Sequence, residues 1–252
     1  MWRRAIMLGS WVRSSFSSKI LTSSSNLQHN HLPHQKQYGM KFVDLFMTET
    51  EKLAKEGKQP DKIRPFITFV LGGPGSGKGT QCTKIAETFG FLHISAGELL
   101  RKEMSSNCEY GAIIRDIIKE GKIVPSEITV NLIHKAIKST SNQNILIDGF
   151  PRSDENRMAF ERIVGVEPDL VIFFDCPEDE MVKRVLSRNE GRIDDNTETV
   201  KKRLKVFDKL NLPVITYYSW KGKVQKINAV GTAEEIFEKV RQLFASERCR
   251  IL

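Results

Sequence analysis

The chain has 252 residues, of which 40% are hydrophobic and 28% are charged, a composition typical of a globular protein with a hydrophobic core. Its formal net charge is +8, but six basic residues precede the first acid, Asp44, and removing those six leaves only +2 for the rest. We therefore expect no nucleic-acid partner, and because no run approaches about 18 consecutive apolar residues we expect no membrane partner.

The first 40 residues have the composition of a targeting segment. Residues 1–25 contain four basic residues, eight serines and no acid, as organellar transit peptides do. We expect residues 1–40 to be a transit peptide or a disordered tail. The protein would then lie in the mitochondrion or plastid if the tail is cleaved, and in the cytoplasm and nucleus if it is not. Three histidines at positions 29, 31 and 34 fit a solvated linker better than a metal site.

The next segment, residues 41–61, places Phe42, Leu45, Phe46 and Leu53 near helical spacing. This spacing predicts an extension helix that ends in a polar linker. The main domain is expected over residues 62–252.

The main domain alternates short apolar runs with longer helical stretches. Strands are predicted at residues 65–71, 91–95, 144–148, 169–175 and 223–227, and helices at 81–90, 109–121, 126–139, 179–188 and 232–244. Apolar strands separated by helices indicate an α/β domain with a parallel sheet that is covered on both faces.

A glycine-rich loop follows the first predicted strand, with the pattern Gly72-x-x-x-x-Gly77-Lys78. A loop of this kind between a strand and a helix is typical of a phosphate-binding P-loop, because its backbone N–H groups and the helix N-terminus face the phosphates. Lys78 adds a positive charge that can follow a transferred phosphoryl group.

The position after the P-loop lysine, which usually carries a hydroxyl that binds Mg²⁺, departs from the commonest pattern. The residue after Lys78 is Gly79, and the hydroxyl comes one position later, at Thr80. Direct ligation of Mg²⁺ by a hydroxyl is therefore in doubt. Asp148, at the carboxyl end of a predicted strand, is expected to hold the metal ion through a water molecule.

Five motifs, GGPGSGKGTQC, SAGELLR, EGKIVP, LIDGFPR and GRIDDN, stand in the order and spacing of the nucleoside monophosphate kinase (adenylate kinase) family. The chain resembles this family over roughly residues 64–247 and is most similar to its eukaryotic UMP–CMP kinases. The resemblance implies a P-loop kinase with a central parallel five-stranded sheet, a helical monophosphate-binding insert at about 95–126 and a short lid at about 188–197.

The resemblance also implies an activity, a cofactor and an oligomeric state. The expected reaction is phosphoryl transfer from ATP to CMP, UMP and dCMP, with Mg²⁺ as cofactor and a monomeric enzyme. The alternative is an adenylate kinase with AMP as acceptor. The sequence does not indicate which acceptor, UMP, CMP or a deoxy form, is preferred.

Each site residue takes its role from this resemblance. Arginines suit these roles because a guanidinium group can donate two hydrogen bonds to phosphate oxygens. The catalytic residues would be Lys78, Arg152, Arg188, Arg192 and Arg203. The ATP-binding residues would be Gly75, Ser76, Gly77, Lys78, Gly79, Thr80, Arg188 and Gly231. The monophosphate-binding residues would be Arg101, Lys122, Ile123, Val124, Gly149, Phe150, Pro151, Arg152, Asn156, Arg192 and Arg203.

Two positions favour a pyrimidine acceptor. Asn156 stands where adenylate kinases carry glutamine, and Ala96 stands where they often carry a hydroxyl residue. A shorter amide presents its donor and acceptor at different positions to a base edge. A GTPase-like switch is disfavoured because the chain has no N-K-x-D or D-x-x-G motif.

The remaining cysteines and histidines are interpreted as structural. The four cysteines are scattered and show no Cys-x-x-Cys spacing, which favours reduced packing residues over zinc ligands or disulfides. His93 and His134 lie in apolar surroundings and are expected to be packing residues as well.

Overall fold

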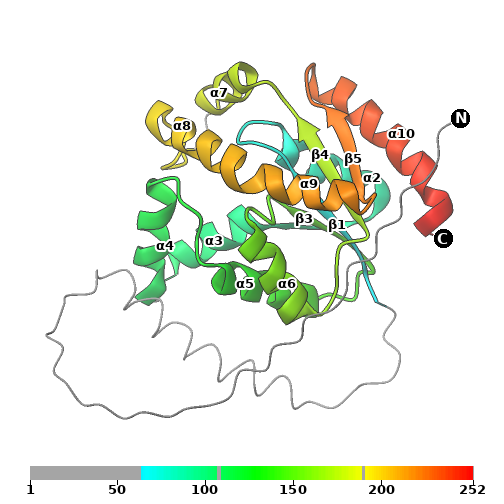
Figure 1. Ribbon diagram of the computed structural model, residues 1–252, viewed down its shortest axis with the longest axis horizontal. Coiled ribbons are helices and arrows are strands. Elements are labelled where there is room, and N and C mark those ends of the chain that lie inside the picture. The colour runs from blue at the N-terminus through cyan, green and yellow to red at the C-terminus, as the bar shows by residue number, and fades with distance from the viewer. Residues whose placement is uncertain (1–63, 107–108, 189–190, 252) are drawn as a thin grey trace, which may run out of the picture. The chain divides into compact units, whose positions relative to one another are not determined.

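The computed structural model describes residues 64–106, 109–188 and 191–251 (Figure 1). The predicted transit peptide and the predicted helix at 41–61 lie outside these residues. The strands are β1 (Phe66–Leu71), β2 (Leu92–Ser95), β3 (Asn144–Asp148), β4 (Leu170–Asp175) and β5 (Val224–Asn228). The helices are α2 (Lys78–Phe89), α3 (Ala96–Ser105), α4 (Glu109–Lys119), α5 (Ser126–Lys138), α6 (Asp154–Val164), α7 (Glu178–Leu186), α8 (Thr197–Val206), α9 (Leu212–Trp220) and α10 (Ala233–Ile251). A π-helical turn, η1 (Phe207–Asn211), joins α8 to α9.

The five strands form one parallel sheet in the order β2-β3-β1-β4-β5. Every predicted strand is present, and the predicted fold class is confirmed. β1 lies in the centre, paired with β3 on one side and β4 on the other. Its residues are almost all buried, as expected for a strand covered on both faces.

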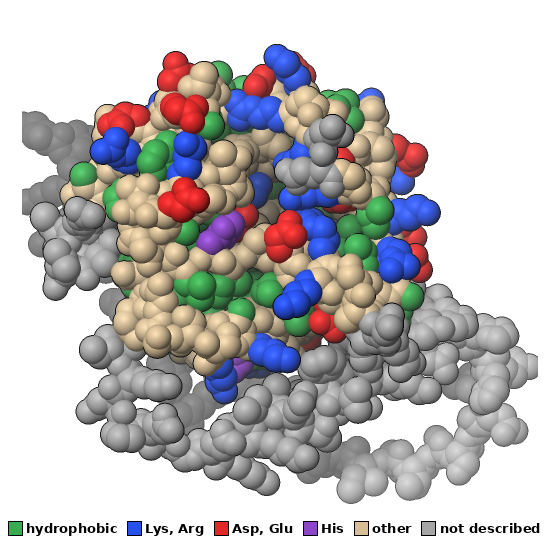
Figure 2. All heavy atoms as spheres, turned by 180° about the vertical axis from the view of Figure 1, so that it is seen from behind, with side chains coloured by type: hydrophobic (Ala, Val, Ile, Leu, Met, Phe, Trp, Pro, Cys, Tyr) green, Lys and Arg blue, Asp and Glu red, His purple; other side chains and the backbone are tan. Residues whose placement is uncertain are grey.

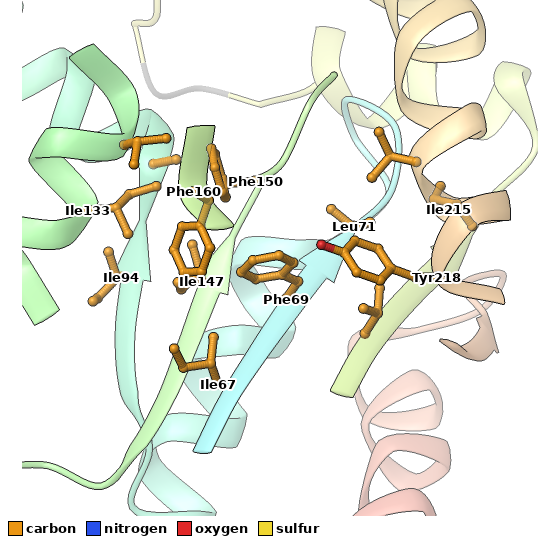
Figure 3. Close-up of a cluster of buried hydrophobic side chains, with 14 of the residues drawn as sticks. Ile67, Phe69, Leu71, Ile94, Ile133, Ile147, Phe150, Phe160, Ile215 and Tyr218 are labelled. Carbon is orange, nitrogen blue, oxygen red and sulfur yellow. The ribbon is translucent and has the colours of Figure 1, made fainter. Parts of the chain in front are cut away.

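The side chains of β1 alternate between two hydrophobic clusters. Ile67, Phe69 and Leu71 face a cluster that also includes residues of α3, α5, α6 and α9 (Figure 3). Val70 faces the opposite cluster, which includes residues of α2, α7, α8 and α10. The protein therefore has three layers, with helices on both faces of the sheet.

The order of the strands determines where a ligand binds. From β1 the chain passes to one side of the sheet through β2 and β3, and then to the other side through β4 and β5. A crevice forms at such a switch point, at the carboxyl ends of the strands. The P-loop follows β1 and Asp148 ends β3, so both lie at this edge.

Among the residues that the structure describes, no helix combines the length and the apolar character needed to cross a bilayer.

Candidate active site

A polar cleft lies at the carboxyl ends of β1 and β3. It encloses about 1160 Å³ of empty space, part of it open to solvent. Its charged lining residues are six cations and two acids, namely Lys78, Arg101, Arg152, Arg188, Arg192, Arg203, Glu98 and Asp148. A space-filling view shows cationic side chains, carboxylates and a histidine gathered around a hollow on one face (Figure 2). This charge balance favours a polyanion.

An adjoining hollow of about 510 Å³, part of it open to solvent, shares part of this lining. Lys78, Gly149, Arg152 and Arg203 border both spaces. Residues 121–123, which include the predicted monophosphate-binding positions Lys122 and Ile123, border only the second. Lys78 and the two arginines therefore stand between two spaces, an arrangement that suits a reaction joining two substrates.

The P-loop packs closely on α7. Gly75 has a φ of +83°, and a Cβ atom at this position would collide with the backbone oxygen of Met181. Only glycine adopts this positive φ without strain and has no Cβ to collide with Met181. Gly77, Gly79 and Thr80 line the larger cleft, whereas the Ser76 side chain is fully buried.

The Lys78 side chain folds back over the loop. Its Nζ atom donates hydrogen bonds to the carbonyl oxygens of Gly72, at 2.8 Å, and Gly73, at 2.7 Å. Burial lowers the pKa of Lys78 to about 8; Asp148 opposes this shift, and the neighbouring Arg152 and Arg203 reinforce it. Phosphate oxygens at this position would restore the charged form.

This pKa predicts how activity depends on pH. Above pH 8 the free protein loses the Lys78 proton, so kcat/KM for ATP should fall about tenfold per pH unit. Between pH 8 and 10.5 the unfolded chain binds more protons at this site than the native state. The Lys78 contribution to the free energy of unfolding therefore rises in the same range. Initial rates and urea unfolding at each pH would check both trends, and a flat kcat/KM up to pH 10 would contradict the first.

Arg152 is held by its own loop. Its Nε donates to the Gly149 carbonyl at 3.0 Å, and its backbone N–H donates to Asn156 Oδ1 at 3.0 Å. Burial, followed by the charge of Arg203, lowers its pKa to about 10. The guanidinium remains charged at neutral pH, but its raised free energy favours an anionic partner.

The Arg203 side chain is held by the predicted lid segment. Its Nη1 lies 2.7 Å from Asp194 Oδ2 and 3.5 Å from Asp195 Oδ1. Arg188 Nη1 lies 3.7 Å from Asp195 Oδ2. Burial lowers the pKa of Arg203 even though Asp194 stabilises its charged form. The two aspartates therefore orient the arginines that reach the cleft from α8 and from the end of α7.

Glu98, which the sequence motifs did not single out, connects the predicted insert to the predicted lid. Its Oε1 atom accepts hydrogen bonds from Arg101 Nε, at 3.1 Å, and Arg192 Nη2, at 3.2 Å. The Arg101 hydrogen bond lowers the pKa of Glu98, so the carboxylate stays charged. One carboxylate thus holds two arginines that were predicted to bind substrate phosphates.

The carboxylate of Asp148 suits a metal ion that accompanies a nucleotide. Its Oδ1 atom is buried and has no hydrogen-bond partner among the residues that the structure describes. A Cβ placed on Gly79 would lie 3.7 Å from Oδ2, so the loop leaves space beside the carboxylate. An unpaired buried carboxylate oxygen next to a P-loop fits Mg²⁺, which prefers oxygen ligands and keeps several waters.

Several predicted site residues do not line the cleft through their side chains. Val124 and Phe150 are buried, and Phe150 packs edge-to-face on Phe69 (Figure 3). Pro151 and Asn156 are also buried. Phe150 can therefore face a ligand only through its backbone.

Gly231 is connected to the P-loop through Arg184, a residue that no motif indicated. Arg184 donates to the carbonyl oxygens of Ala229, at 3.0 Å, and Gly231, at 3.2 Å. Its Nη1 would lie 3.9 Å from a Cβ on Gly77. Arg184 thus joins α7 to the β5–α10 loop and lies beside the P-loop at Gly77.

Comparison with known proteins agrees with this geometry. The family model for adenylate kinases matches residues 70–223. The chain is 56% identical to the UMP-CMP kinase of Prunus armeniaca, covering 97% of this chain and 98% of that protein. It is 58% identical to UMP-CMP kinase 2 of Oryza sativa subsp. japonica, covering 98% of this chain and all of that protein. It is 45% identical to the uridylate kinase of Saccharomyces cerevisiae, covering 72% of this chain and 91% of that protein.

Proposed function

The chain belongs to the adenylate kinase family, and we propose that it transfers the γ-phosphoryl group of ATP to UMP and CMP, giving ADP and UDP or CDP. Adenylate kinase activity, with AMP as acceptor, is not favoured, because the relatives at 54–58% identity over nearly the whole chain are named UMP-CMP kinases.

The observation that carries this proposal is the charge of the cleft. Lys78 and five arginines, contributed by separate elements, line one space at the P-loop. Transfer between two nucleotides gathers several negative charges at one point, and catalysis then rests on positioning and electrostatic stabilisation. A protein that only binds one nucleotide has no need of arginines on both sides of the P-loop lysine.

The residues divide into three groups around the transfer point. The P-loop amides and Lys78 hold the phosphates of ATP, with Arg188 and Gly231 toward its base. Arg101 and Arg152 hold the acceptor phosphate. Arg192 and Arg203 stabilise the charge that develops on the transferring group.

Asp148 would hold Mg²⁺ through water. When bound, Mg²⁺ neutralises charge on the β- and γ-phosphate oxygens. The lid over residues 188–197 would exclude water, which could otherwise accept the phosphoryl group.

Asn156 is the proposed determinant of the acceptor base. Because the Arg152 backbone N–H can only donate, the atom facing it must be Oδ1, and Nδ2 then donates to Ser126 Oγ at 2.8 Å. The amide is therefore fixed in one orientation, and because Asn156 is buried, a base edge can reach its remaining lone pair and N–H only if the surrounding residues move on binding. We expect Asn156→Gln to raise kcat/KM for AMP relative to UMP by about 10–200-fold.

The control for this prediction is Ser126→Ala, which frees the amide without lengthening it. Steady-state rates with AMP, UMP and CMP would be compared for both variants. An unchanged AMP-to-UMP ratio in Asn156→Gln would remove Asn156 from the choice of base.

The proposed reaction is tested by turnover of the full chain. Purified protein with Mg-ATP is given UMP, CMP, dCMP or AMP, and the diphosphates are separated by chromatography. Fast conversion of UMP and CMP with slow conversion of AMP supports the proposal. Preferred conversion of AMP would keep the phosphate site but overturn the choice of acceptor.

We also propose a monomer that serves pyrimidine nucleotide synthesis in the mitochondrion or plastid, with residues 1–40 as a cleaved transit peptide. N-terminal sequencing of the protein recovered from cells tests the location. A new N-terminus near residue 40 would support import, and an intact Met1 would favour the cytoplasm and nucleus.

A further inference from the structure

Three side chains with metal-binding atoms meet beneath the cleft. Cys82 comes from α2, His93 from β2 and Asp148 from the end of β3, and one ligand atom of each lies within 4.8 Å of the others. His93 and Asp148 line the cleft, whereas Cys82 is fully buried behind them. This Cys82–His93–Asp148 cluster opens to the space that ATP is proposed to occupy.

Two atoms of the cluster lack the partners that buried polar atoms normally have. His93 Nε2 and Asp148 Oδ1 are buried and have no hydrogen-bond partner within the described part of the chain. Since buried polar atoms are usually hydrogen-bonded, unpaired atoms in one cluster point to a missing ligand. A cation would accept electron pairs from both the imidazole and the carboxylate, whose Nε2 and Oδ2 atoms lie 3.5 Å apart.

The spacing of two of the three ligand atoms suits a tetrahedral cation, and the third, Cys82 Sγ, lies within 4.8 Å of both. Zinc lies about 2.0–2.1 Å from histidine nitrogen and about 2.0–2.2 Å from carboxylate oxygen, so tetrahedral geometry separates these two ligands by about 3.4 Å. The observed distance from His93 Nε2 to Asp148 Oδ2 is 3.5 Å. Sulfur and imidazole ligands favour zinc, whereas Mg²⁺ prefers oxygen.

We infer that Cys82, His93 and Asp148 form a binding site for Zn²⁺, separate in chemistry from the Mg²⁺ that accompanies ATP. The Cys82 thiol gives up its proton to solvent when sulfur binds, and the fourth position faces the cleft. Asp148 belongs to both sites. Zn²⁺ therefore inhibits phosphoryl transfer by withdrawing this carboxylate from the nucleotide-bound metal.

Binding is measured on the full chain without nucleotide, because ATP itself chelates metal ions. Calorimetry with Zn²⁺ uses a background variant in which His29, His31 and His34 are alanine, which removes the histidines of the N-terminal tail. In this background we expect one Zn²⁺ per chain. Cys82→Ala and His93→Ala should each weaken binding at least about 10–100-fold. Cys176→Ala, which removes another buried cysteine, is the matched control and should leave binding unchanged.

Absorption of the Co²⁺-loaded protein tests the ligands directly. A sulfur-to-cobalt charge-transfer band should appear, and it should vanish in Cys82→Ala and persist in Cys176→Ala. If Cys82→Ala does not fold, the question is decided by two other samples. The band should appear in the protein with an intact Cys82–His93–Asp148 cluster and should be lost in His93→Asn. Absence of the band, or a Zn²⁺ affinity that neither Cys82 nor His93 affects, overturns the inference.

Turnover links the site to activity. Zn²⁺ should inhibit the unaltered protein, and Cys82→Ala should turn over normally but need at least about tenfold more Zn²⁺ for the same inhibition. Equal inhibition of both proteins would overturn the inhibitory role. Because the binding experiments contain no substrate, their outcome is independent of the proposed phosphoryl transfer.

Discussion

Arg192→Met should lower kcat by about 10³–10⁵-fold, because an arginine that stabilises a transferring phosphoryl group contributes a factor of that size. KM for ATP should change much less, since the interaction forms mainly in the transition state. The ion pair of Arg192 with the exposed Glu98 contributes little to stability, so the variant should remain folded. Steady-state kinetics with UMP and ATP, and thermal unfolding, would check these expectations.

The matched control is Arg162→Met, which removes an exposed arginine paired with Glu127 at 3.0 Å, away from the cleft. Its kcat should stay within about twofold of the unaltered protein, as for most surface substitutions. A loss of less than tenfold in Arg192→Met would mean that this arginine does not face the transferring group. Arg203 is a poorer test, because its removal leaves the buried Asp194 without this ion pair and Asp195 with only Arg188.

Lys78→Met should lower kcat/KM for ATP by about 10²–10³-fold, the effect of removing one preorganised electrostatic contact. The charged lysine is partly buried and its pKa is already lowered, so an apolar side chain of similar length removes a desolvation penalty. We therefore expect the variant to be at least as stable as the unaltered protein. Initial rates over a range of ATP concentrations, together with urea unfolding, would test both parts.

Lys84→Met provides the comparison within the same helix. Lys84 pairs with the exposed Glu234 at 3.0 Å and does not line the cleft. Its removal should change kcat/KM less than twofold. If both lysine variants lost activity equally, the loss in Lys78→Met would reflect a disturbed helix α2 and not a lost contact with phosphate.

The sheet was predictable because its strands are buried on both faces. Such strands appear as continuous apolar runs, and all five were found. Helix prediction was less complete, because α3, α6, α8 and α9 were not named. Local signals for α3 and α6 were nonetheless present: Ser95 and Ser153 cap these helices, and Glu98 follows Ser95 at the spacing of a capping box.

The site was predictable where its residues lie in recognisable motifs. The P-loop follows from its own glycine and lysine pattern and the arginines from the resemblance, and the cleft brings Lys78 and all five arginines together. Glu98 and Arg184 were missed because their roles depend on partners 94 and 47 residues away along the chain.

His93 was interpreted as a packing residue because its sequence neighbours are apolar. In β2, however, Leu92 and Ile94 pack on the cluster of α3, α5, α6 and α9, and the His93 imidazole instead lines the cleft near Asp148. Alternation along a strand predicts opposite faces, but it does not show which face meets a cleft.

The shared carboxylate of Glu98 has a consequence for how the binding of one substrate affects the binding of the other. Its Oε1 atom accepts from Arg101 of the predicted insert and from Arg192 of the predicted lid, so each arginine must give up this hydrogen bond before it turns onto a phosphate. If the first nucleotide displaces the Glu98 side chain from both arginines, the second binds where this contact is already broken. The two substrates should therefore bind with positive heterotropic coupling, each tightening the binding of the other by the same factor.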